Sequence, residues 1–153
     1  MNIDPTTVFS TDHWALILPD GWVYQKQEDP GPYFESPDSS VGLYIRVIRK
    51  NPNIELMNDL DWLNSIMAIQ ERSLLSMPNS SFIVLKQQVL TEAKGTIGFL
   101  EGLDEGANYR ISCLHFLRSL LCITVNLHDY HCTNLVKSRS MEGALLAGFK
   151  AMA

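Results

Sequence analysis

The side chains with the most reactive chemistry lie close together toward the end of this chain. His128, Asp129, His131 and Cys132 fall within five positions. Imidazole and thiolate groups are the ligands that zinc prefers, so His128, His131 and Cys132, with Cys113 from earlier in the chain as a further ligand, form one candidate metal site. The CxxC and HExxH patterns of common zinc sites are missing, and histidine and aspartate also serve well in turns and at helix N-termini. We therefore favour a strand-to-helix loop without a metal and keep the metal site as an alternative.

A cysteine nucleophile is the second chemistry that the sequence offers. Cys113 and His115 are two positions apart, which places both side chains on one face of an expected strand. A histidine beside a cysteine can act as the base that forms the reactive thiolate. The neighbouring strand residues are mostly apolar, and they predict a buried, inert thiol.

Other catalytic motifs are absent from the sequence. It contains neither the glycine-rich phosphate-binding loop that ends in Lys-Ser/Thr nor the Gly-x-Ser-x-Gly motif of a serine nucleophile. We therefore expect a protein that is not an enzyme and uses no cofactor. A small metal- or thiol-dependent enzyme built on His128, His131 and Cys132 is the alternative from another class.

Charge and composition narrow the choice of partners. The 153 residues carry a net charge of −5, and residues 1–61 contain ten acidic but only four basic residues. An acidic surface repels phosphate, which argues against nucleic acid, and it attracts a basic protein surface. The alternative is that the charge only keeps the protein soluble.

The location is predicted from three features. Cys113, Cys122 and Cys132 are odd in number and are expected to be reduced thiols. Residues 1–10 contain no basic residue and no apolar run typical of a signal peptide. The sequence also lacks the roughly 18 consecutive apolar residues that a membrane-spanning helix needs. These features predict a cytoplasmic protein that does not enter a membrane.

The first third of the chain is expected to form short strands. The apolar segment 14–18 and the segment 22–24 flank Pro19-Asp20-Gly21, a turn signal that predicts a hairpin. A further strand is expected at 33–35. The clearest strand is 41–48, where Val41, Leu43, Ile45 and Val47 share one face and the opposite face is predicted to be only partly covered.

The remaining elements must position the residues near the end of the chain. Leucine, isoleucine and methionine recur at helical spacing from about residue 56, and Pro78 ends that helix. Four strands are expected at 82–90, 95–101, 108–117 and 120–127. A C-terminal helix is expected over about 133–151, with Thr133 as its N-cap.

This order predicts an α+β protein with an α/β/α sandwich architecture, in which a mostly antiparallel sheet is flanked by a long middle helix and a C-terminal helix. No linker or repeat interrupts the chain, so residues 1–153 are expected to form a single domain.

The candidate partner-binding residues are aromatic and acidic side chains in the turn-rich N-terminal half. Aromatic residues near exposed turns bury much area with few rotamers, which makes them good interface anchors. Burial in the core is the competing explanation for each of them. The residues in this set are Trp22, Tyr24, Glu28, Asp29, Tyr33, Glu35, Asp38 and Tyr44.

The pattern of the N-terminal half resembles that of the PsbP/Mog1/DcrB-like superfamily. It consists of an apolar strand that runs into Leu-Pro-Asp-Gly-Trp at 18–22, and the turn Ser36-Pro37-Asp38 before the strand that begins at Val41. A long middle helix, a run of strands and a C-terminal helix extend the resemblance over nearly the whole chain. The resemblance implies an α/β/α sandwich around an antiparallel sheet. It assigns no functional residue, because the shared positions are structural.

The resemblance also implies a role in binding. Bacterial cytosolic members of this superfamily include chaperones of type VI secretion effectors, and similar small acidic proteins act as immunity proteins. Our leading hypothesis is an immunity protein that binds and neutralises a cognate bacterial toxin. The second is an effector chaperone that holds hydrophobic segments in an apolar groove. A polar, acidic concavity would favour the first role and a large apolar one the second.

Overall fold

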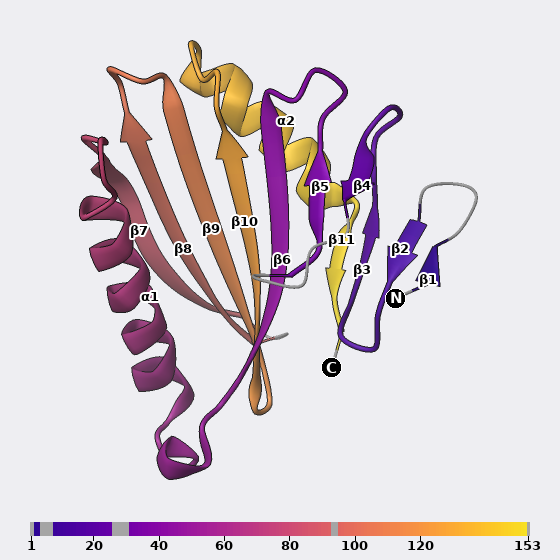
Figure 1. Cartoon of the computed structure of the whole chain (residues 1–153). Helices are drawn as coiled ribbons and strands as arrows, with labels where there is room; N and C mark the ends of the chain where they lie inside the picture. The colour runs from indigo at the N-terminus through magenta and orange to yellow at the C-terminus, as the bar shows by residue number, and fades with distance from the viewer. Residues whose placement is uncertain (1, 4–7, 26–30, 93–94, 153) are drawn as a thin grey trace.

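The centre of the molecule is a twisted antiparallel sheet (Figure 1). The computed structural model describes residues 2–3, 8–25, 31–92 and 95–152, and within these ranges the sheet has seven strands. In spatial order the strands are β4 (Val23–Gln25), β5 (Tyr33–Glu35), β6 (Val41–Arg49), β10 (Leu121–Asp129), β9 (Tyr109–Arg118), β8 (Gly95–Asp104) and β7 (Ile83–Glu92).

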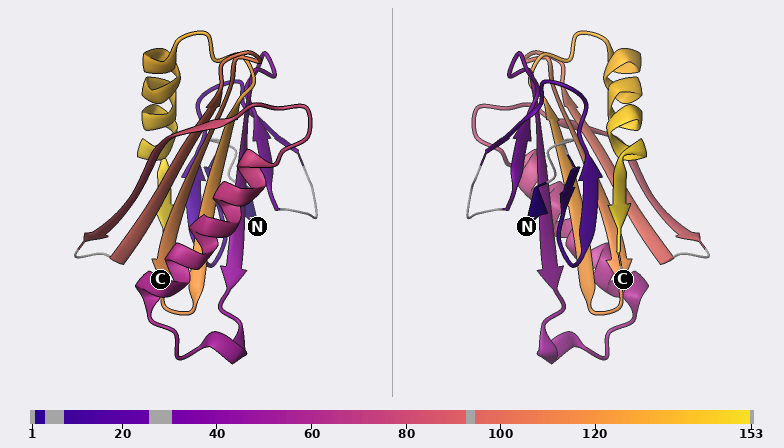
Figure 2. Two further views of the ribbon diagram at one scale, coloured as in Figure 1. Left: turned by 90° about the vertical axis from the view of Figure 1, so that its left-hand side faces the viewer. Right: turned by 90° about the vertical axis from the view of Figure 1, so that its right-hand side faces the viewer.

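The two faces of this sheet are covered by different elements. The long helix α1 (Asp59–Leu75) follows the 3-10 turn η1 (Pro52–Ile54) and lies on one face. The helix α2 (Leu135–Ala147) lies on the other face (Figure 2). A small antiparallel sheet packs beside α2, and its strands are β1 (Asn2–Ile3), β2 (Val8–Ser10), β3 (Trp14–Ile17) and β11 (Phe149–Ala151). The predicted α+β layered fold is confirmed.

Alternation along β6 and β10 separates two cores. On β6, Val41, Leu43 and Ile45 point toward the small sheet, and Ile123, Val125 and Leu127 of β10 join them in the core cluster on that side. The opposite faces of the same strands point toward α1 and carry more polar residues. There Tyr44 is partly exposed and Arg46 is exposed. This confirms that the second face of β6 is only partly covered.

Helix α1 begins where the sequence provides a cap. The Asn58 side chain accepts a hydrogen bond from the Asp61 backbone N–H at 2.8 Å, and two aspartates lie in the first turn, where the helix dipole favours negative charge. The helix ends at Leu75, three residues before Pro78. Its buried side chains, among them Leu63, Met67 and Leu74, form the second core with β8 and β9.

Two glycines of β8 allow α1 to lie directly on the sheet. A Cβ atom at Gly98 would come within 2.6 Å of Met67 Sδ, and one at Gly102 within 2.4 Å of Leu74 Cδ2. Both distances are far inside van der Waals contact, so the helix occupies the space that side chains would need. The glycines serve helix packing here, and the β-bulge of this region lies on β7 between Val84 and Lys86.

The predicted hairpin of segments 14–18 and 22–24 is wrong. β3 pairs with β2 and β11 in the small sheet, and β4 pairs with β5 in the large one. The turn at 19–21 carries the chain from one sheet to the other, with Gly21 at a φ of +84°. Since both edges of β3 are already paired, β4 has no place beside it.

The predicted extent of the C-terminal helix is also wrong. Asn134, not Thr133, caps α2, through a hydrogen bond from the Lys137 N–H to its side chain. The helix ends at Ala147, and Phe149–Ala151 form strand β11 against β3. Gly148 makes the change of direction possible, because a Cβ atom there would lie 2.5 Å from the Ile17 carbonyl oxygen.

A buried charge network joins α2 to the sheet. Arg110 is fully buried and donates to Glu101 at 2.9 Å, to Glu142 at 2.6 Å and to Ser138 at 3.2 Å. Arg139, which is half exposed, donates to both oxygens of Glu101. Burial alone raises the pKa of Glu101, but the hydrogen bonds from the two arginines outweigh it and hold that pKa below its usual range.

Replacing Gly98 with alanine is expected to destabilise the fold. The new methyl group would overlap Met67 and Leu63, and overpacking of this kind costs about 1–3 kcal/mol of unfolding free energy. Gly143→Ala on α2 is the matched control, because a Cβ there meets nothing within 4 Å. The control should be neutral or stabilising by about 1 kcal/mol. Equal stability of Gly98→Ala and wild type in urea unfolding would contradict the close approach of α1.

Replacing Arg110 with leucine is expected to destabilise the protein by about 3–5 kcal/mol, because it removes the cation between two buried carboxylates. Arg139→Leu removes a half-exposed partner of the same Glu101 and should cost about 1 kcal/mol or less. Chemical denaturation of both variants measures the difference. Similar losses for the two would show that the buried position of Arg110 has no special weight.

Candidate binding surface

The predicted partner-binding residues do not lie on one surface. Tyr24 packs toward the small sheet, with its ring 5.4 Å from that of Phe34 and 5.6 Å from that of Phe9. Trp22 is partly buried against the same core. Both side chains therefore support the fold on the side opposite to α1.

Tyr33, Glu35 and Tyr44 share the other face. β5 and β6 pair so that Tyr33 lies opposite Tyr44, and both side chains point to the side of the sheet that carries α1. Asp38 lies elsewhere, in the turn before β6, where it accepts hydrogen bonds from Ser36 and Ser40. Glu28 and Asp29 lie outside the described residues.

The structure adds further aromatic rings to Tyr33 and Tyr44. Their two rings stack with centroids 4.5 Å apart, and the imidazole of His128 lies 5.3 Å from the ring of Tyr44. The Tyr130 ring stacks on His128 at 5.9 Å, and the Tyr109 hydroxyl lies 2.6 Å from His128 Nδ1. We call these five residues, Tyr33, Tyr44, Tyr109, His128 and Tyr130, the tyrosine cluster.

Four residues of this cluster, Tyr33, Tyr109, Tyr130 and His128, are uncharged at neutral pH. Burial raises the pKa of Tyr33, Tyr109 and Tyr130, and burial lowers the pKa of His128 to about 4. The Tyr33 hydroxyl donates to Glu35 at 3.0 Å. Glu35 therefore adds a carboxylate to a set of neutral rings.

A groove runs from the cluster along α1. Its floor is the α1 side of β6, β9 and β10, and its wall is the helix. Gln70 crosses it, donating from Nε2 to Asn126 Oδ1 at 3.0 Å, so the groove has an upper and a lower part. The upper part, about 190 Å³, reaches His128, and the lower part, about 520 Å³, reaches Ile48 and Trp62.

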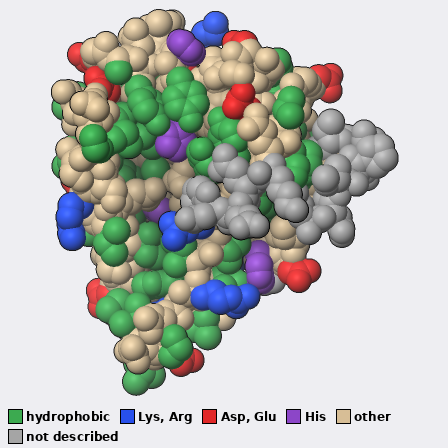
Figure 3. Space-filling model, viewed as in Figure 1, with side chains coloured by type: hydrophobic (Ala, Val, Ile, Leu, Met, Phe, Trp, Pro, Cys, Tyr) green, Lys and Arg blue, Asp and Glu red, His purple; other side chains and the backbone are tan. Residues whose placement is uncertain are grey.

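The groove is mostly apolar. Figure 3 shows hydrophobic side chains gathered on this face of the molecule, with histidine, lysine and arginine side chains among them. Ile66 and Ile69 of α1 face Ile48 of β6 across the lower part, and Ile69 is 60% exposed. An apolar concavity of this kind is a surface on which another molecule can bury area.

Two buried polar atoms in the groove have no hydrogen-bond partner among the residues that the structure describes. The His115 Nδ1 lies 2.9 Å from the Thr124 hydroxyl, but the buried Nε2 makes no hydrogen bond, and the same is true of Gln70 Oε1. A buried polar atom without a partner costs free energy. Any occupant of the groove that bonds to these atoms would recover that cost.

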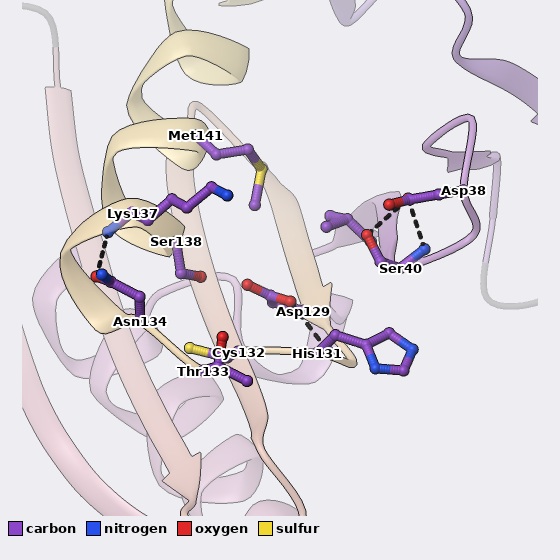
Figure 4. A pocket seen from close by; sticks show the side chains of 11 residues that line it. Asp38, Ser40, Asp129, His131, Cys132, Thr133, Asn134, Lys137, Ser138 and Met141 are labelled. Atoms are coloured by element: carbon purple, nitrogen blue, oxygen red, sulfur yellow. Dashed lines mark hydrogen bonds between the residues drawn. The ribbon is translucent and has the colours of Figure 1, made fainter.

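A second, more polar pocket of about 460 Å³ lies on the other side of the molecule (Figure 4). Lys137 and Met141 of α2 face the turn that contains Asp38 and Ser40 across it. Asp129 is buried at its base and accepts a hydrogen bond from the His131 N–H. Its carboxylates and lysine partly balance one another, so it offers a mixed polar surface.

The reactive residues near the end of the chain are not brought together. His128 points into the groove, whereas His131 and Cys132 line the pocket of Figure 4. The described ranges contain no group of three or more His, Cys, Asp and Glu side chains placed to hold a metal ion. Cys113 and Cys122 are buried, and burial raises the pKa of each thiol, for Cys122 to about 11. This environment disfavours a reactive thiolate.

Sequence reasoning missed several residues of this surface, above all Gln70, Tyr109 and Tyr130. The alternation of polar and apolar residues along β10 could have indicated this surface, because Thr124 and Asn126 lie on the face opposite to the apolar core. That polar row lies beside the incompletely covered face of β6, on the same side of the sheet. Two such faces on neighbouring strands indicate an open surface.

Comparison with solved structures supports the fold. No protein-family model matches the sequence, and no curated protein matches it by sequence. The solution structure of cyanobacterial PsbP (CyanoP) from Synechocystis sp. PCC 6803 is similar with a TM-score of 0.71 and 11% identity, covering 99% of this chain and 96% of that one. The crystal structure of the Ran-binding protein Mog1p from Saccharomyces cerevisiae is similar with a TM-score of 0.54 and 6% identity, covering 90% and 89%.

At these identities the similarity establishes the fold alone. It confirms, at that level, the resemblance to the PsbP/Mog1 superfamily that the N-terminal segment and the order of elements predicted. None of the helices in the described part of the chain is long and apolar enough to cross a membrane.

His115 is expected to make stability depend on pH. Burial lowers the pKa of its imidazole from 6.5 to about 4, so the unfolded chain binds more protons than the folded one between these values. The free energy of unfolding should therefore fall as the pH drops from about 6.5 toward 4. His115→Gln should remove up to about 1.4 kcal/mol of this dependence per pH unit, measured by urea unfolding at pH 7, 6 and 5. An unchanged pH profile would contradict a neutral, buried His115.

Proposed function

We propose that this chain is a non-enzymatic protein-binding domain and that its partner docks on the open face beside α1. The observation that carries the proposal is the apolar groove along α1, whose lining includes the unpartnered His115 Nε2 and Gln70 Oε1. A partner segment in the groove would bury apolar area and could satisfy both polar atoms. The Ran-binding protein Mog1p supports the proposal, since it shows that this fold can serve protein recognition.

The specific role that we propose is that of an immunity protein, which binds and neutralises a cognate bacterial toxin in the cytoplasm. The excess of acidic residues in positions 1–61 supports this role, because it would speed association with a basic protein. Glu35 extends that negative charge to the open face.

An effector chaperone of the type VI secretion kind is the second candidate. The apolar lining of the groove favours it, because a chaperone must shield hydrophobic segments of its client from water. Both roles use the same face. They differ in what binding does to the partner, which is blocked in one case and kept soluble in the other.

The role of the groove in partner binding is tested by placing a charged side chain at an exposed apolar position in its lining. Ile69→Glu should weaken binding of the partner at least about tenfold, because the partner would have to remove water from a carboxylate where it otherwise buries an exposed isoleucine. The partner is first captured from the native host with tagged wild-type protein, and affinities are then measured by calorimetry. Val136→Glu on α2 is the matched control, since Val136 is also an exposed apolar helix residue and lies on the opposite side of the sheet.

Two outcomes would contradict the proposal. One is equal affinity of Ile69→Glu and wild type, and the other is an equal loss in Val136→Glu. Co-expression of the partner separates the two roles. An immunity protein restores growth of cells that make an active toxin, whereas a chaperone raises the soluble amount of its client.

A further inference from the structure

The tyrosine cluster contains a continuous chain of ring contacts beside one carboxylate, that of Glu35. Tyr33 stacks on Tyr44, Tyr44 meets His128, and His128 stacks on Tyr130. The Tyr33 ring packs against Gly42, where a Cβ atom would come within 2.5 Å of it. The backbone of β6 therefore fixes the position of the first ring.

The electrostatics of the tyrosine cluster and Glu35 favour the binding of one cation. Aromatic faces carry negative charge density and attract ammonium and guanidinium groups. Burial lowers the pKa of His128 to about 4, so its imidazole carries no positive charge at pH 7 that would repel a bound cation. Glu35 supplies a full negative charge at the edge and is partly exposed.

Other occupants fit this chemistry less well. An anion would be repelled by Glu35, and an apolar side chain would cover the carboxylate without pairing it. A guanidinium group can stack on a tyrosine ring and donate to the carboxylate at once, because it is planar and has donors along its edge. Lysine, a compact and strongly hydrated charge, can do only part of this.

We propose that the tyrosine cluster and Glu35 bind the side chain of an arginine that the protein partner presents. The inference rests on the proposed function, because the arginine belongs to the partner that docks in the groove. His128 joins the two places, since it belongs to the cluster and also lines the upper part of the groove. A segment lying along α1 would reach the cluster at its end.

The probe for this site is N-acetyl-arginine amide, titrated at millimolar concentrations into ¹⁵N-labelled protein. Saturable shifts of amide resonances should be confined to residues 33–35, 42–46 and 128–130. N-acetyl-citrulline amide has nearly the same shape without the charge and should bind about three- to tenfold more weakly.

Three substitutions sharpen the test. Glu35→Gln and Tyr44→Leu should each weaken binding of the arginine probe about three- to tenfold, whereas Tyr44→Phe keeps the ring and should bind like wild type. Glu105→Gln is the control for loss of a carboxylate, because Glu105 lies exposed in the turn between β8 and β9. Equal binding of arginine and citrulline probes, or equal effects of Glu35→Gln and Glu105→Gln, would overturn the inference.

The experiments distinguish failure of the proposed docking groove from failure of the proposed arginine site. If the arginine probe does not bind but Ile69→Glu still abolishes partner capture, the groove stands and the cation site is wrong. If the probe binds as expected but Ile69→Glu has no effect, the cation site stands and the groove is not the docking surface.

Discussion

The close approach of α1 to β8 is the constraint on which the rest of this surface depends. Gly98 and Gly102 have no side chains, so the helix settles over β8 and β9 and not over the middle of the sheet. The same face of β5, β6 and β10 is left without a covering helix. The groove and the tyrosine cluster both lie in the area that this displacement leaves open. Ordinary side chains on β8 would push the helix away from this edge and toward the groove.

The two faces of the sheet solve the problem of buried polar groups in opposite ways. Toward α2, Arg110, Glu101 and Glu142 are ionised and paired, which fixes the helix in one position. Toward α1, the buried histidines His115 and His128 are neutral at pH 7, because burial lowers the pKa of each to about 4, and the charged side chains of Arg46 and Glu35 stay in contact with solvent. A neutral floor can receive an apolar segment without the cost of stripping water from charges. The first face holds the fold together and the second remains available for binding.

Local pattern predicted much of the fold and little of the site. The alternation of β6 and β10 and the helical spacing of α1 come from burial on one face, which sequence period records directly. The pairing of β3 and β4 could not be deduced, because a turn signal does not say which sheet the next strand enters. Strand β11 has only three residues and exists through its pairing with β3. The tyrosine cluster joins Tyr33 to Tyr130, which only the order of strands in the sheet brings together.

Fewer residues of the acidic aromatic half of the chain are available for the proposed binding than its composition indicates. Strand alternation turns Trp22 and Tyr24 into the core and leaves Tyr33, Glu35 and Tyr44 on the open face. Excess negative charge acts over about a Debye length and mainly speeds encounter with a basic partner. The time that a partner stays bound depends on buried contacts, and the groove supplies these. In the proposed complex, charge and groove would therefore act on different steps of one association, and Glu35 would take part in both because it lies where the charged half meets the open face.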